Sequence, residues 1–123
     1  MSRAPAGSAP VVAVALAGAM ALGACSSSTA SGPTVAVTAT DTACQVGTAS
    51  LPAGRHAFSV QNNGNQVTEV YVYADGDKVM AERENIGPGT SARFTVSLRA
   101  GTYTVACKPG QTGTGIRQPL TVT

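Results

Sequence analysis

From Thr34 to the end of the chain, short apolar segments alternate with turn signals, and this rhythm constrains the fold more than any other feature. Apolar residues at every second position are typical of strands that bury one face. Such segments contain Val35 and Val37, Phe58 and Val60, residues 67–73, Phe94 to Leu98, Tyr103 and Val105, and Leu120 and Val122. Turn residues separate them, and the pattern therefore predicts an all-β sandwich of seven to eight strands.

Two alternatives to this reading depend on single features. Lys78 to Asn85 is the one stretch that fits a short helix. An immunoglobulin-type sandwich would want a core Trp between its two cysteines, and the chain has no Trp. Asp75-Gly76 fits a hairpin turn better than a calcium loop, because the remaining ligand spacing is absent.

The first 24 residues have the composition of an export signal rather than of a folded domain. Arg3 precedes the apolar run Val11 to Leu22, which is too short to span a bilayer. The run ends in Leu22-Gly23-Ala24-Cys25, which resembles a bacterial lipobox with lipidation of Cys25. An ordinary secretory signal without lipidation is the alternative. We expect a signal peptide over 1–24, a flexible tether over 25–33 and one domain over 34–123.

The charge balance restricts the partners. Without Arg3, seven Lys and Arg stand against six Asp and Glu, and they form no basic cluster. This argues against nucleic acid as a partner. The expected attachment to the membrane is the lipid on Cys25, which places the domain on the outer face of the cell membrane.

Cys44 and Cys107 remain as a pair once Cys25 is set aside. In an exported domain such a pair favours a disulfide, which would close a loop of about 60 residues and contribute roughly 4 kcal/mol. Two thiolates that bind a metal are the alternative, and one molecule cannot contain both. His56, the only histidine, follows a turn beside Arg55, and we expect it at the surface.

Two motifs resemble a known family. Gly101-Thr102-Tyr103 leading to Cys107, with Leu120-Thr121-Val122 at the end, is similar to the C-terminal half of a cupredoxin, a Greek-key sandwich. The block from Glu82 to Gly89 (ERENIGPG) resembles the cupredoxin-like domain of the periplasmic iron-uptake lipoproteins EfeO and EfeM. The resemblance covers about Thr34 to Thr123.

The chain departs from electron-transfer cupredoxins at their copper ligands. A type-one copper site needs two His, a Cys and a weak axial ligand. Where the family has its first His, this chain has Thr68 and Glu69, and Gly110 and Ile116 stand where the second His and the axial Met would be. We therefore expect no type-one copper site and no copper electron transfer.

The iron-uptake resemblance instead implies a different metal site, for iron or copper. Its candidate ligands are Cys44, Glu69, Cys107 and Glu84, with Glu82 as the alternative to Glu84. We expect a binding role rather than an enzyme, because no nucleophile stands beside a base. The implied partners are an iron-uptake permease or an imelysin-like helical protein, which follows the cupredoxin part in longer relatives. The alternative function is a disulfide-stapled module that docks a partner protein without metal.

Overall fold

The computed structural model describes residues 2–10 and 32–123. Residues 2–10 form no helix or strand. The predicted signal segment and Cys25 lie mostly outside the described residues, as does the tether up to residue 31. Among the described residues, no helix is long and apolar enough to cross a bilayer.

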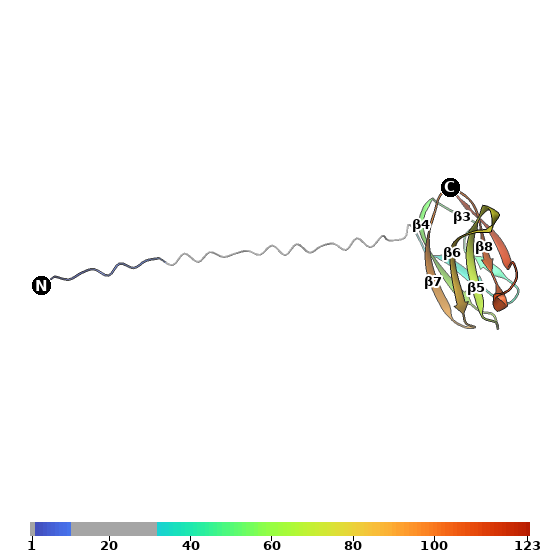
Figure 1. Cartoon of the computed structure of the whole chain (residues 1–123), viewed down its shortest axis with the longest axis horizontal. Helices are drawn as coiled ribbons and strands as arrows, with labels where there is room; N and C mark the ends of the chain where they lie inside the picture. Colours follow the sequence, from blue (N-terminus) through green and yellow to red (C-terminus); the bar gives the residue numbers. More distant parts are fainter. Residues whose placement is uncertain (1, 11–31) are drawn as a thin grey trace.

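Within residues 32–123, nine strands form two sheets that pack face to face (Figure 1). The first sheet has the strand order β2-β1-β4-β7. Its strands are β1 (Val35–Ala39), β2 (Cys44–Val46), β4 (Gly54–Asn62) and β7 (Ser91–Leu98). The second has the order β3-β9-β8-β5-β6. Its strands are β3 (Ser50–Leu51), β5 (Thr68–Ala74), β6 (Lys78–Ile86), β8 (Gly101–Cys107) and β9 (Ile116–Val122).

The predicted all-β sandwich is confirmed, with nine strands instead of seven to eight. Most neighbouring strands are antiparallel, but β1 runs parallel to β4 and β3 runs parallel to β9. The short helix considered for Lys78 to Asn85 was wrong, because this stretch is strand β6 and pairs with β5. The Asp75-Gly76 signal does make the hairpin turn, as the 3-10 turn η1 (Asp75–Asp77) with Gly76 at φ 70°.

The core lies between the sheets and consists of the alternate residues that the sequence pattern marks. Phe58 and Val60 on β4 and Val70 and Val72 on β5 are fully buried. Phe58 stacks on Phe94 with 5.2 Å between ring centroids. Burying aliphatic and aromatic side chains of this kind contributes about 1.5–3 kcal/mol each.

A disulfide joins Cys44 on β2 to Cys107 on β8 and so connects the two sheets. Both cysteines are buried, at 1% and 0% exposure. The disulfide expected from the export signal is confirmed.

The expectation for His56 was wrong. Its side chain points inward from β4 on the same face as Phe58, and only 1% of the residue is exposed. The turn before it places His56 as the first inward-facing residue of the strand, so it lies at one end of the core.

Candidate functional site

The strand β5 places Glu69 on the outer face of the five-stranded sheet. Val70 and Val72 point into the core, so the alternation of the strand turns Glu69, Tyr71 and Tyr73 to the opposite face. Glu69 is nevertheless only 8% exposed. A carboxylate that is this far removed from water needs a compensating partner.

Lys108 supplies that partner. Its backbone N–H donates to the Glu69 carbonyl over 2.8 Å, which places Lys108 directly across from Glu69 at the end of β8. Its Nζ lies 4.0 Å from Oε1 of Glu69, and the two side chains are 14% and 11% exposed. The same ammonium lies 4.1 Å from the ring centroid of Tyr71, a distance at which a cation is attracted to an aromatic face.

A β-bulge brings acidic side chains to the other side of Glu69. Between Thr68 and Val70, strand β5 has one residue, whereas β6 has two, Glu84 and Asn85. Asn85 adopts φ 57°, and its N–H donates to the side-chain oxygen of Gln111 over 2.9 Å. The bulge is part of the ERENIGPG block and ties that block to the loop after Cys107.

The Tyr71 hydroxyl lies among these carboxylates. It donates to Oε1 of Glu84 over 3.4 Å, and Tyr71 pairs with Glu82 across the ladder. Burial raises the pKa of Tyr71 far above its usual value, and the hydrogen-bonding and negative charge of Glu82, Glu69 and Glu84 raise it further. The phenol therefore keeps its proton at neutral pH unless a cation binds its oxygen.

A second cation, the guanidinium of Arg117, lies beside Tyr73, the tyrosine that stacks on Tyr71. Tyr71 and Tyr73 stack with 5.2 Å between their centroids, and the guanidinium of Arg117 lies 5.0 Å from the Tyr73 ring. Arg117 also binds Asp77 through two bonds of 2.8 and 3.2 Å. The hydrogen bonds from Arg117 lower the pKa of Asp77.

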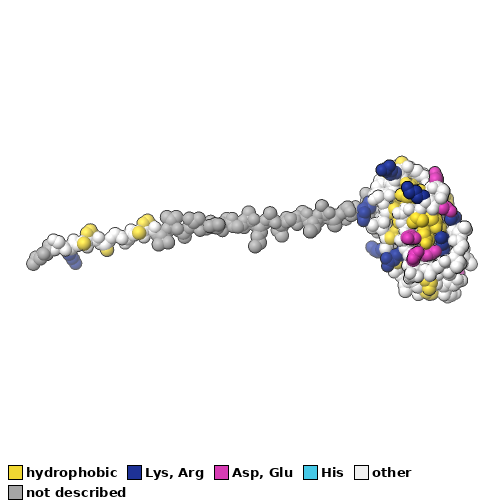
Figure 2. Space-filling view, viewed as in Figure 1, with side chains coloured by type: hydrophobic (Ala, Val, Ile, Leu, Met, Phe, Trp, Pro, Cys, Tyr) yellow, Lys and Arg dark blue, Asp and Glu magenta, His cyan; other side chains and the backbone are white. Residues whose placement is uncertain are grey.

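Together these side chains form what we call the β5 outer cluster: Glu69, Tyr71, Tyr73, Glu82, Glu84, Lys108 and Arg117. Acidic side chains gather beside a hydrophobic strip on the side of the molecule where β6 and β7 meet (Figure 2). The cluster contains oxygen donors from three carboxylates and two phenols. In the part of the chain that the structure describes, no three His, Cys, Asp or Glu side chains are close enough to hold a metal as they stand.

The expected ligand set of Cys44, Glu69, Glu84 and Cys107, with Glu82 as alternative, is not brought together. Cys107 pairs with Val70, and both side chains point into the core, so Glu69 is on the opposite face of the sheet. The sulfurs are joined to each other and supply no thiolate. Only Glu69, Glu82 and Glu84 share a face.

Sequence reasoning missed Tyr71 and Lys108 as members of the site. The available signal was register, because Lys108 opposes Glu69 once Cys107 opposes Val70.

The fold and the sequence match known proteins. A family model described as a cupredoxin-like domain matches residues 12–116. The iron uptake system component EfeO of Escherichia coli K12 and that of Shigella flexneri are each 39% identical over 75 residues. The match covers 61% of this chain but 20% of each relative, so it corresponds to one part of much longer proteins.

Among solved structures, reduced auracyanin from Roseiflexus castenholzii superposes with a TM-score of 0.56. The alignment covers 72% of this chain and 94% of auracyanin, at 17% sequence identity. At that identity, the likeness concerns the fold.

Proposed function

Because this chain belongs to the family of cupredoxin-like domains, we propose that it serves iron uptake by holding an iron ion at the β5 outer cluster. The observation that carries this proposal is the nearly buried carboxylate of Glu69, which lies on one sheet face with Glu82, Glu84 and the phenol of Tyr71. Carboxylate and phenol oxygens are hard donors that suit iron. Cuprous copper prefers sulfur, and the sulfurs here are joined in a disulfide.

The cluster would take up the ion by exchanging one cation for another. Lys108 neutralises Glu69 in the structure as described, and its ammonium lies between Glu69 and the Tyr71 ring. The incoming ion would replace this ammonium, while the exposed side chains of Glu82 and Glu84 turn toward it. Lys108 would then swing into solvent on its flexible stem, and its return would help release the ion.

We further propose that the domain works outside the cytoplasm, attached to the membrane by a lipid on Cys25. This part of the proposal is supported by the sequence of residues 1–25 alone. A lipid anchor would hold the cluster near an iron-uptake permease or a helical partner, to which the ion would pass.

Terbium(III) luminescence tests the metal site. Terbium is a hard trivalent ion that tyrosine sensitises at short range, and the chain has three Tyr and no Trp. Tyr71 and Tyr73 belong to the cluster, so bound terbium should emit on tyrosine excitation, and ferric citrate should displace it.

Glu69→Gln should abolish the emission. Asp75→Asn, which removes an exposed carboxylate from η1, is the matched control and should leave it unchanged. Emission that is absent in the unaltered protein, or equal in both variants, would contradict the proposal.

A second candidate function is favoured by the Lys108–Glu69 contact itself. Since Lys108 already neutralises Glu69, the domain needs no metal to offset the burial of that charge. The domain would then be a disulfide-stapled module that docks a partner protein. Co-purification of an uptake permease with both the unaltered protein and Glu69→Gln, without terbium emission from either, would favour this candidate.

A further inference from the structure

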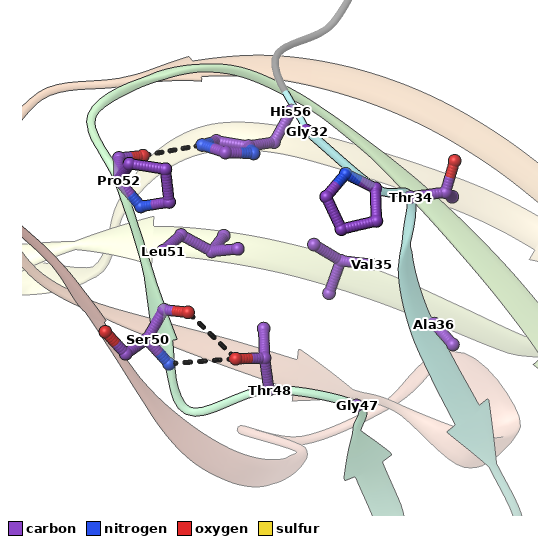
Figure 3. A pocket seen from close by; sticks show the side chains of 11 residues that line it. Gly32, Thr34, Val35, Ala36, Gly47, Thr48, Ser50, Leu51, Pro52 and His56 are labelled. Carbon is purple, nitrogen blue, oxygen red and sulfur yellow. Dashed lines mark hydrogen bonds between the residues drawn. The ribbon is translucent and has the colours of Figure 1, made fainter.

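A cavity of about 340 Å³ opens at the end of the sandwich away from the β5 outer cluster. Strand β1 connects the two ends of the sandwich. Its first residue, Val35, lines the cavity. Its last residue pairs with Cys44, whose disulfide partner Cys107 is next to Lys108 of the cluster. Leu51, Pro52 and His56 line the cavity as well (Figure 3). Its size is in the range of small-molecule sites.

His56 lines this cavity, and its ring contains a hydrogen-bond acceptor that has no partner among the described residues. Its Nε2 lies 2.6 Å from the carbonyl oxygen of Pro52. A carbonyl only accepts, so Nε2 carries the proton and donates, and the neutral ring keeps its lone pair on Nδ1. Nδ1 is buried and has no hydrogen-bond partner among the described residues. In Figure 3 this nitrogen faces the side of the ring on which Leu51 and Val35 lie.

The rest of the cavity wall is mostly apolar. Val35, Leu51 and Pro52 present carbon atoms, and Val35 and Leu51 are among the buried core residues. The hydroxyl of Thr48 is already engaged with Ser50, because it donates to the carbonyl over 2.8 Å and accepts from the N–H over 3.3 Å.

We infer that this cavity binds a compact, largely apolar small molecule with a single hydroxyl or N–H group, which donates to Nδ1 of His56. A phenol has this chemistry. An apolar molecule of the same shape without a donor would leave Nδ1 unpaired, and sites built around a buried acceptor reject such analogues. The inference concerns different residues from the metal proposal and stands independently of it.

Nitrogen NMR of the purified full chain tests this inference without any substitution. The chain has one histidine, so the imidazole signals belong to His56. The protein is titrated with 4-ethylphenol and, as the matched probe, with its methyl ether, which keeps the oxygen but has no donor. We expect the phenol to bind at least about tenfold more tightly, and to move the Nδ1 resonance in the direction of an accepted hydrogen bond, while the protonated Nε2 stays as it is.

Three outcomes would overturn the inference. The first is equal affinity for the phenol and the ether, which would mean that Nδ1 does not select a donor. The second is phenol binding that leaves the His56 resonances unchanged, and the third is the absence of binding by either probe. A Leu51→Phe variant, which fills the cavity with a larger apolar side chain, should lose phenol binding and provides a second test that leaves His56 intact.

Discussion

The ammonium of Lys108 and the carboxylate of Glu69 face each other across adjacent strands, 4.0 Å apart, and both side chains are nearly excluded from water. The separation is longer than that of a close charge-assisted hydrogen bond. The pair therefore neutralises charge without locking the two groups together, which is the property that an exchangeable counter-ion requires.

Lys108→Gln should strengthen cation binding at the β5 outer cluster. Removing the ammonium leaves the Glu69 charge without its partner, so a trivalent ion no longer competes with Lys108. Without metal, the variant should lose about 1–3 kcal/mol of unfolding free energy, as a buried charge left unpaired does. Terbium titration and urea unfolding measure the two effects.

The matched control is Lys78→Gln, which removes the same charge from an exposed position on β6. If Lys108→Gln binds terbium more weakly than this control does, Lys108 supports metal binding and does not compete with the ion for Glu69.

Replacing both cysteines should destabilise the sandwich without unfolding its sheets. The bridge joins the two sheets and closes a separation of 63 residues, for which the chain-entropy model gives about 4 kcal/mol. Urea unfolding of the Cys44→Ala, Cys107→Ala double variant measures this loss. Terbium binding should persist in the double variant, because the sulfurs are on the core side of the sheet. If terbium binding disappears although the variant remains folded, the cysteines contribute to the site.

Tyr71→Phe should make the stability of the folded protein depend less on pH under alkaline conditions. Its pKa is raised in the folded protein above its ordinary 10.0, so the unfolded chain releases this proton first as the pH rises. The contribution of Tyr71 is complete below that ordinary value and is lost above it. Melting temperatures from about pH 8 to about pH 11 should fall more steeply for the unaltered protein than for the variant. Parallel curves would show that neither burial nor the surrounding carboxylates raise the pKa of Tyr71 in the folded protein.

Asn62→Ala should cost about 3 kcal/mol of unfolding free energy. Asn62 is 1% exposed, and its Nδ2 donates to the carbonyls of Gln66 and Ile86 over 2.8 and 2.9 Å. Its Oδ1 accepts from the N–H of Gly64 over 2.9 Å. The substitution leaves these backbone groups without their partner where β4, β5 and β6 meet. Asn63→Ala, at the exposed neighbouring position, should change stability by less than about 0.5 kcal/mol. Similar losses from both variants would indicate a turn effect instead of the buried network.

The sequence predicted the sandwich because strand alternation is a local property. A buried strand face can be predicted from local sequence alone, as at Val35 and Val37 or at Phe58 and Val60. The Cys44–Cys107 bond was predicted because only two cysteines remain after Cys25 in a chain whose first residues resemble an export signal. Both inferences need composition and spacing but no register.

The site could not be predicted in the same way, because it depends on which residues oppose each other across strands. The pairing of Val70 with Cys107 sends Glu69 to the other face and sets Lys108 opposite it. The bulge at Asn85 shifts β6 by one residue and decides which Glu faces Tyr71. His56 was misplaced for a related reason, since a lone polar residue after a turn gives no sign that it faces the core.

The irregular path of β6 has a consequence beyond the cluster. This strand forms an open edge of its sheet and contains two bulges, one beside Glu69 and one between Val72 and Tyr73. An edge that is interrupted twice and carries Glu82, Arg83 and Glu84 in its middle presents a poor template for a strand from another molecule. Copies of this domain at high local concentration would therefore resist joining into continuous sheets.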